Sequence, residues 1–216
     1  MALIRRSPPQ DDSDKKDFDP IPNLEEKEYE ARLVMVADLG MQLQEYNGEE
    51  KPSRQEIALG LEIVGETILI DEKEVPRLLW SKPFKIFHKL TKKGHELKFY
   101  SIFDSDAKVN QVPDWDAQLG KCCSVRVVHT QGKGDNAGFT YDNVGLLLPI
   151  PEKYRDGVPP ASMELAIGDA DNEDNVVTKA LFGLTRFVYD KRIQNQQDTS
   201  ASDVDLLDDY DYDLPY

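Results

Sequence analysis

The chain has 216 residues and a formal net charge of −15, and 39% of its residues are hydrophobic. This length is typical of one domain with tails. No apolar run approaches the roughly 20 residues that a membrane span needs, and residues 1–6 lack the long apolar region of a signal peptide. Two adjacent cysteines, Cys122 and Cys123, and three scattered histidines match no zinc-ligand spacing. We therefore expect a cytoplasmic protein that has no membrane partner and no metal.

Charge is distributed unevenly along the chain. Residues 198–216 hold seven aspartates and no Lys or Arg. Dense like charge with few aliphatic residues cannot offset the entropy lost on ordering, so we predict a disordered acidic tail over residues 196–216. Residues 1–23 mix charges with four prolines and show no apolar period, which predicts a disordered N-terminal arm. The folded domain is then expected to span residues 24–195, and its mildly acidic character argues against a general duplex-DNA binder.

Alternating apolar residues and β-branched side chains indicate strands in the first half of this domain. The predicted strands are residues 29–39, 54–64, 67–70 and 78–88. Gly40 is expected to end the first strand, and residues 41–53 are expected to form a turn-rich connection. Gly60 is typical of a bend or bulge, and Gly65-Glu66 is typical of a tight turn.

The second half begins with a helical pattern and then returns to strands. The predicted elements are a helix at 96–104, a loop at 113–119, strands at 121–130 and 139–150 joined by a glycine-rich loop, a loop at 154–174 and a helix at 176–193. We expect a mainly β fold, a five-stranded OB-fold-like Greek-key barrel with a short helix between strands three and four and an added C-terminal helix. Other small barrels and sandwiches fit the same strand spacing.

A basic and aromatic window interrupts this acidic chain. Residues 77–98 hold seven Lys or Arg residues and a single acid. If the last of the four strands above forms, Trp80, Lys82 and Phe84 share one face. Single-stranded nucleic acid needs this mixture, because cations bind phosphates and flat rings stack on bases. Two alternatives compete: each aromatic can fill the core instead, and a local helix starting at Pro83 would cancel the shared face.

Further candidates border the groove that an OB-fold uses, on its inter-strand loops and its last two strands. The predicted contacts to single-stranded DNA are Tyr46, Arg54, Arg77, Trp80, Lys82, Phe84, Lys89, Lys121, Arg126, His129, Lys133, Phe139 and Tyr141. Gly132 and Gly134 permit close backbone approach to a phosphate, although an ordinary hairpin loop explains them equally well. The phosphate-loop pattern GxxxxGK[ST] is absent.

No arrangement typical of an enzyme or a metal site is evident. The chain has no GxSxG or HExxH motif, and three histidines offer little for acid–base catalysis. Residues 169–175 are acidic like a calcium loop, but Asp174 and Ala180 replace the glycine and the glutamate that an EF-hand requires. We expect a protein that is not an enzyme and has no cofactor; a metal-dependent nuclease using scattered carboxylates is a third alternative.

The last six residues, Asp-Tyr-Asp-Leu-Pro-Tyr at 211–216, place acids before an apolar residue, a proline and an aromatic. This tip resembles the C-terminal tip of bacterial and phage single-stranded DNA-binding proteins, although the bacterial family more often ends in Phe. Residues 29–40 and 80–84 also resemble first- and third-strand sequences of phage proteins of that type. The chain as a whole is therefore similar to a phage-type single-stranded DNA-binding protein.

The resemblance implies a protein that coats single-stranded DNA without sequence specificity during phage replication and recombination, in the host cytoplasm. The acidic tail would compete with DNA for a basic groove and recruit replication proteins such as DNA polymerase. The residues expected to bind such partners are Asp208, Asp209, Asp211, Asp213, Leu214, Pro215 and Tyr216. The alternative function is a protein-interaction module or DNA mimic with acidic ends, and the tail alone can be a solubilising segment. A homo-oligomer is compatible with the sequence.

Overall fold

The computed structural model describes residues 22–70, 72–132 and 138–192. Strand makes up 45% of these residues and helix 17%, which confirms the mainly β class. The predicted arm at 1–23, apart from its last two residues, lies outside the described residues, and so does the predicted tail at 196–216.

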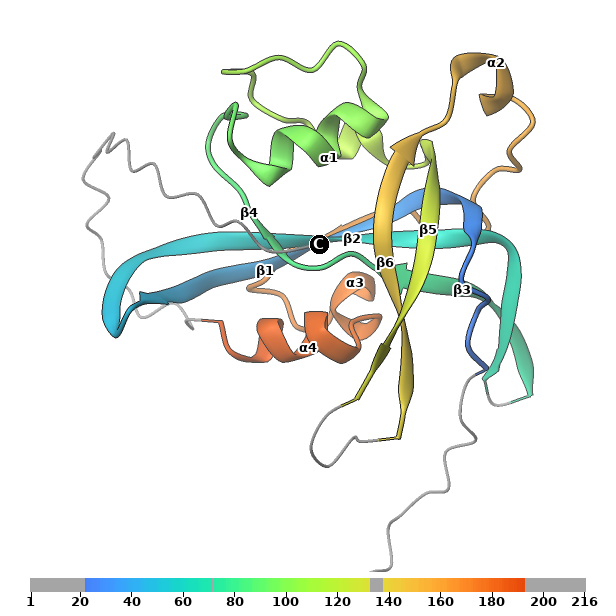
Figure 1. Cartoon of the computed structure of the whole chain (residues 1–216), viewed down its shortest axis with the longest axis horizontal. Helices are drawn as coiled ribbons and strands as arrows, with labels where there is room; N and C mark the ends of the chain where they lie inside the picture. Colours follow the sequence, from blue (N-terminus) through green and yellow to red (C-terminus); the bar gives the residue numbers. More distant parts are fainter. Residues whose placement is uncertain (1–21, 71, 133–137, 193–216) are drawn as a thin grey trace, which may run out of the picture.

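Seven strands of the described residues form one sheet, and Figure 1 shows their arrangement. They are β1 (Glu28–Tyr46), β2 (Glu49–Ile70), β3 (Lys73–Trp80), β4 (Phe84–Lys85), β5 (Cys122–Gln131), β6 (Thr140–Pro149) and β7 (Ala166–Gly168). The hydrogen-bonded order is β3-β2-β1-β5-β6, with β4 paired to β2 and β7 paired to β1. β7 runs parallel to β1, whereas the other pairs in the described residues are antiparallel.

Short helices flank this sheet. Those in the described residues are α1 (His95–Phe103), the 3-10 turn η2 (Asp116–Gln118), α2 (Glu152–Arg155), α3 (Val176–Lys179) and α4 (Gly183–Asp190). α1 lies on one side of the paired β1 and β2, and α4 lies on the other (Figure 1). The predicted helix at 96–104 and the predicted strands at 121–130 and 139–150 are confirmed as α1, β5 and β6, each within one residue at its ends.

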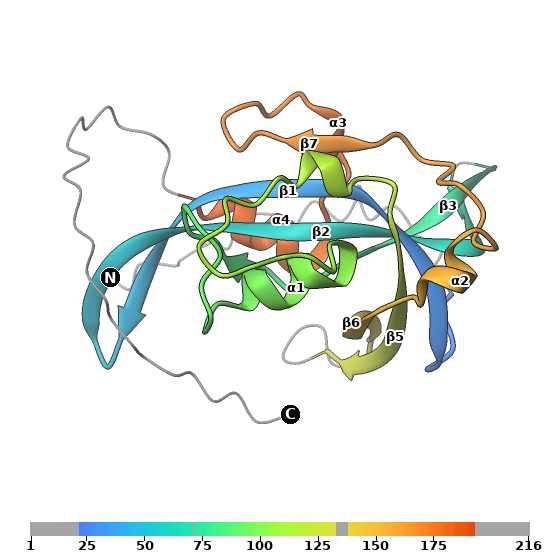
Figure 2. The same cartoon turned by 90° about the horizontal axis from the view of Figure 1, so that it is seen from above.

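β1 and β2 form one long hairpin that extends beyond the rest of the sheet (Figure 2). Its turn is Asn47-Gly48, where φ is 55° and 79°; positive φ at both positions is typical of a type I′ turn. β1 continues past Gly40, so the prediction that Gly40 ends the strand is wrong. The connection predicted at 41–53 is likewise wrong, because most of it belongs to the two strands. Gly40 instead lies at a register shift in the β1–β2 pairing, which is a β-bulge.

Two further predictions for this part of the chain need correction. Gly65, with φ of 78°, lies inside β2 where its pairing to β3 is irregular, so it forms a bulge and not a tight turn. The strand predicted at 78–88 is interrupted, because β3 ends at Trp80 and β4 holds only two residues. Pro83 between them has no backbone N–H to donate to a ladder, which explains the break.

The single helix predicted at 176–193 is two helices, α3 and α4. Gly183 begins α4 with φ of 56°, a conformation that a continuous right-handed helix cannot contain. A single helix over 176–193 would turn Val177, Leu181 and Leu184 toward the core on one stripe; with the break at Gly183, Leu184 is instead 54% exposed. Val177 and Leu181 are buried as expected, so the segment does pack on the domain.

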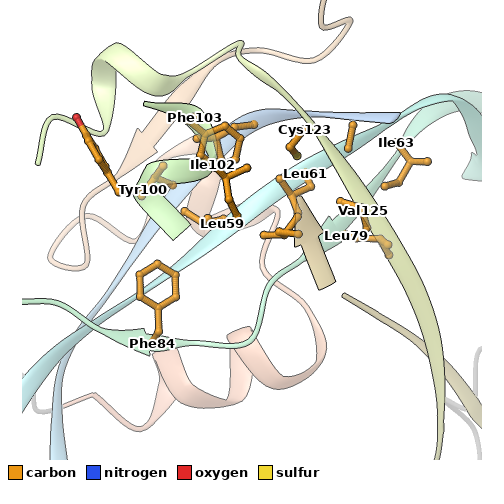
Figure 3. Close-up of a cluster of buried hydrophobic side chains, with 14 of the residues drawn as sticks. Leu59, Leu61, Ile63, Leu79, Phe84, Tyr100, Ile102, Phe103, Cys123 and Val125 are labelled. Carbon is orange, nitrogen blue, oxygen red and sulfur yellow. The ribbon is translucent and has the colours of Figure 1, made fainter. Parts of the chain in front are cut away.

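In the described residues the core has two large parts, one on each face of the β1–β2 hairpin, and a small third cluster of Cys122, Ile150 and Val158. One part includes Leu61 of β2 and Tyr100 of α1, which are labelled in Figure 3. The other part packs Trp80 of β3 with Val177 of α3. An added Cβ on Gly60 would lie 2.9 Å from a β1 side chain and 3.1 Å from the Trp80 ring. Gly60 therefore permits a close approach in the second part of the core, next to a register shift of the β1–β2 pairing.

A buried ion pair joins β3 and β6, the two ends of the strand order. Arg77 donates to Asp142 Oδ2 across 2.6 Å, and the two side chains are 9% and 3% exposed. The backbone N–H of Leu24 donates to the same oxygen at 2.9 Å, and His129 Nε2 lies 3.3 Å from Oδ1. Removing one partner of such a pair is strongly destabilising, because it leaves an uncompensated buried charge. The Arg77–Asp142 pair therefore stabilises the contact between β3 and β6.

Candidate nucleic-acid interface

Most of the basic window forms a segment that follows β3, called here the basic segment (residues 82–98). It holds six lysines and one acid. Two apolar side chains anchor it to the core: the Phe84 ring lies 4.6 Å from the Phe99 ring, and Leu90 is fully buried. Between these two anchors Lys89 is exposed, whereas Lys85 is half-buried.

Backbone hydrogen bonds fix the basic segment to its neighbours. The N–H of Ile86 donates to the carbonyl of Gln55 on β2 at 3.0 Å. Leu90 donates to Gln111 and accepts from Asn110, both at 2.8 Å. The segment is thus held at several points along its length, which gives its lysines a defined arrangement.

Glu96, the one acid of the basic segment, is buried in the first turn of α1. Its carboxylate accepts hydrogen bonds from Trp115 Nε1 at 3.2 Å and from the backbone N–H of Phe87 at 3.3 Å. Burial raises the pKa of Glu96 above its ordinary value, and the two hydrogen bonds offset part of that effect. Glu96 therefore connects α1 to Phe87 of the basic segment and to Trp115. It places no exposed negative charge among the lysines.

Arg54 and Phe87 supply an aromatic contact beside the lysines. The guanidinium carbon of Arg54 lies 5.6 Å from the centroid of the Phe87 ring, which is within cation–π range. Phe87 is 38% exposed. The sequence predicted Arg54 but not Phe87, because strand alternation placed Phe87 on the face opposite to Trp80. The exposed lysines of the basic segment are Lys82, Lys89, Lys92, Lys93 and Lys98.

Two of the residues predicted to stack on bases are buried. Trp80 is 8% exposed, packs with Val177 and Leu181, and donates from Nε1 to the carbonyl of Ala180 at 3.0 Å. Phe84 is 6% exposed in the other part of the core. The prediction that both rings share one open face of a continuous strand is wrong, because the strand is broken between them and each ring is covered.

Three of the cations predicted to bind DNA instead form contacts within the protein. Arg77 and His129 meet at the buried Asp142 and not at an open surface. Lys121 donates from Nζ to the carbonyl of Phe103 at 3.1 Å and to a side-chain amide oxygen at 2.7 Å. These contacts give the three residues structural roles, and nothing in them brings the side chains to the basic segment.

The remaining described candidates lie on the β5–β6 hairpin. Phe139 and Tyr141 are 57% and 44% exposed, and Arg126 is exposed across from Glu28 in the β1–β5 ladder. The far end of this hairpin lies on the side of the β1–β2 pair opposite to α1 (Figure 1). Phe139 and Tyr141, which lie near that far end, therefore belong to a region separate from the basic segment. Outside the described side chains lie Tyr46, Lys133 and the tail candidates at 208–216.

α4 carries exposed aromatic side chains that the sequence did not single out. Phe182, Leu184 and Phe187 are 51%, 54% and 54% exposed. Lys191 Nζ lies 4.1 Å from the centroid of the Phe187 ring. Four exposed acids precede α3 at 169–174, so charge on this part of the chain is mixed. The helical period missed this surface because it treated two helices as one.

Among residues 22–70, 72–132 and 138–192, no three His, Cys, Asp or Glu side chains gather in a way that would hold a metal ion. No helix in the described part of the chain has both the length and the apolar character needed to cross a membrane. A scan against protein-family models found no match, and a search of curated proteins also found none.

Proposed function

We propose that this chain binds single-stranded DNA without sequence specificity through the basic segment and the Arg54–Phe87 pair. The observation that carries the proposal is a set of exposed lysines beside a partly exposed ring, on a segment anchored by the buried Phe84 and Leu90. Lysines neutralise phosphates, and a ring face stacks on any base. Neither contact reads base edges, so binding is expected to be independent of sequence.

The proposal assigns this interface to an OB-fold-like barrel. The pairing order β3-β2-β1-β5-β6, the helix between β3 and β5, and the Arg77–Asp142 bridge between the end strands support the assignment. OB-folds bind oligonucleotides on the face of strands two and three and on adjoining loops. In this chain α3 packs against Trp80 of β3 and covers that face. The proposed path of the DNA therefore runs along the basic segment, which includes β4.

The proposed role is to coat single strands during phage replication and recombination, as the resemblance of the tail implies. The net charge of −15 supports a localised interface, because acids elsewhere on the chain repel a polyanion. In this proposal the acidic tail recruits replication proteins such as DNA polymerase. Its aspartates also compete with DNA for the lysines.

Fluorescence anisotropy with oligo-dT at two salt concentrations tests the interface. Lys89→Ala and Lys92→Ala should each weaken binding and reduce the slope of log K against log salt by about 0.7, the value for one phosphate contact on a single strand. Lys153→Ala is the matched control, because it removes an exposed lysine of α2 outside the basic segment. Unchanged affinity and slope in both basic-segment variants would contradict the proposed interface.

A second candidate is a protein-interaction module. The exposed Phe182, Leu184 and Phe187 favour it, because aromatic and aliphatic side chains exposed together mark protein interfaces. Oligonucleotide titration separates the two functions. Absence of binding to oligo-dT even at low salt, where phosphate contacts are strongest, would leave the interaction module as the better account.

A further inference from the structure

A pocket of about 520 Å³ lies where the end of α1, η2 and the segment around α2 meet. Its apolar lining includes Phe103, Leu119 and Val158. This pocket, called here the α2 pocket, shares no lining residue with the basic segment. It is therefore distinct from the interface proposed above for DNA.

Three cations line the α2 pocket, and none of them forms an ion pair with a carboxylate of the described residues. Arg32 donates to three backbone carbonyls. Lys121 donates to a carbonyl and to an amide oxygen, and Arg155 donates to a carbonyl. Asp156 also lines the pocket but lies beyond ion-pair distance of all three among the described contacts.

These cations keep hydrogen-bond donors that the described part of the protein does not use. A guanidinium has five N–H donors and an ammonium has three. Arg32 uses three of its donors, Lys121 uses two and Arg155 uses one. Three cations against the one carboxylate of Asp156 leave a net positive charge around a concave, partly apolar surface, which focuses a positive potential there. The pocket thus suits an anion that carries apolar or aromatic groups.

We propose that the α2 pocket binds the end of this chain's own acidic tail, residues 208–216. This segment contains four aspartates, three tyrosines, Leu214 and Pro215, and it has no Lys or Arg. Its aspartates match the three cations, and its rings and Leu214 match the apolar lining. A nucleic acid would match the cations but has no need of the aliphatic lining, so the tail is the better complement.

The tail is long enough to reach the pocket. Residue 208 lies 16 positions after Arg192, the last described residue, and an extended chain spans roughly 3.3 Å per position, about 50 Å in all. A domain of this size has a radius of gyration of about 15 Å. Attachment to the same chain also gives the tail a high effective concentration, in the millimolar range for short flexible linkers. A tail end held in the α2 pocket is withheld from other proteins until they displace it.

Photo-crosslinking in the full chain tests this inference. Tyr212 is replaced by the photoreactive residue benzoylphenylalanine, the protein is irradiated, and the joined peptides are identified by mass spectrometry. The expected crosslinks fall on the peptides that contain Phe103, Leu119 or Val158, in the same chain or in a second copy. Crosslinks that fall mainly on residues 82–98, or no crosslink within the domain, would overturn the inference.

A charge placed at the pocket provides the matched comparison. Ala117 lines the pocket and is exposed, so Ala117→Glu adds a repelling carboxylate with little expected cost to folding. Val112→Glu adds the same charge to an exposed site nearby that does not line the pocket. Ala117→Glu should lower the crosslink yield severalfold, whereas Val112→Glu should leave it unchanged.

Oligo-dT affinity distinguishes this inference from the proposed function, on which it does not depend. In a chain that lacks residues 198–216, where a released tail cannot compete for the lysines, Ala117→Glu should not weaken oligo-dT binding, because the basic segment is intact. If Ala117→Glu weakens that binding as much as Lys89→Ala does, the pocket is part of the nucleic-acid path and the tail assignment is wrong. If oligo-dT does not bind at all but the crosslinks fall in the α2 pocket, the proposed function fails and this inference stands.

Discussion

The α1 side and the α3–α4 side of the β1–β2 hairpin differ in charge and in which rings they expose. On the α1 side Phe84 is buried, and the surface carries lysines with Phe87 among them. On the α3–α4 side Trp80 is buried, and the surface carries Phe182 and Phe187 near an acidic loop. Both sides therefore expose aromatic rings, and local charge is what separates a candidate nucleic-acid surface from a candidate protein surface.

The comparison also shows why net charge is a poor guide to a binding surface. The chain as a whole carries −15, yet six of its lysines fall within the basic segment. The one acid of that segment is buried, where its carboxylate accepts two hydrogen bonds. A charge count along the sequence would include Glu96 as a negative charge near the lysines. Its side chain is buried, so it contributes no exposed negative charge to that surface.

The largest expected effect is on stability, from Trp80→Ala. The indole fills the core between β3 and α3, so its loss removes apolar contacts and a hydrogen bond and leaves a cavity. Phe or Trp to Ala changes in cores typically cost about 3–5 kcal/mol. We expect the free energy of unfolding, measured by urea denaturation, to fall by about that amount.

Phe187→Ala on the same side of the hairpin is the control for Trp80→Ala. Its ring is 54% exposed, so the free energy of unfolding should change by no more than about 0.5 kcal/mol, as for most surface substitutions. A Trp80→Ala protein of wild-type stability that binds oligo-dT more weakly would show that the indole contacts DNA after all.

Trp80 also shows what limits prediction from the sequence. Leu79 and Trp80 do face opposite sides of β3, but the residues that cover Trp80 come from 177–181, far along the chain. Nothing local indicates which face of a strand a distant segment will cover. The strand at 121–130 and the helix at 96–104 were predictable because their patterns are local and uninterrupted. The turn-rich connection predicted at 41–53 does contain the hairpin turn Asn47-Gly48, but the polar residues beside the turn gave no sign that both strands extend up to it.

Phe87→Ala should have the next largest effect, on affinity. Stacking on an aromatic side chain contributes about 1–3 kcal/mol per base, so oligo-dT affinity should fall by about tenfold or more. Because the ring is 38% exposed, stability should change far less than in Trp80→Ala. Anisotropy and urea denaturation of the same preparation give both values. Wild-type affinity in the folded variant would remove Phe87 from the interface.

A smaller effect is expected on the pH dependence of stability, through Glu96. Burial raises the pKa of this carboxyl in the folded protein, so the folded state favours its protonated form. The corresponding stability is fully present below the ordinary pKa of 4.5 and is lost as pH rises through the higher folded value.

Glu96→Gln tests this effect because the amide does not titrate. The free energy of unfolding of the wild type minus that of Glu96→Gln should decrease as pH is raised from 4 toward 7. Subtraction removes the contributions of the other carboxyls, including Asp38, whose pKa burial also raises. A difference that stays constant or increases over this range would contradict the assigned direction.

The smallest expected effect is that of the tail on DNA binding, since it depends on contacts with the basic segment that salt weakens. Under the proposed function, the seven aspartates of the tail would compete with phosphates for the lysines of the basic segment whenever the tail end is not held in the α2 pocket. Deleting residues 198–216 should therefore tighten oligo-dT binding at low salt. The gain should shrink as salt rises, because ions screen the tail and the DNA alike.

Removing only residues 214–216 separates the tip from the charge, because every aspartate of the tail stays in place. DNA affinity should then change little, while capture of the cognate DNA polymerase should be lost if the tip docks on it. A deletion of 198–216 that leaves low-salt affinity unchanged would show that the aspartates do not reach the basic segment. Since the two deletions differ in charge and share the loss of the tip, their difference isolates electrostatic competition from docking.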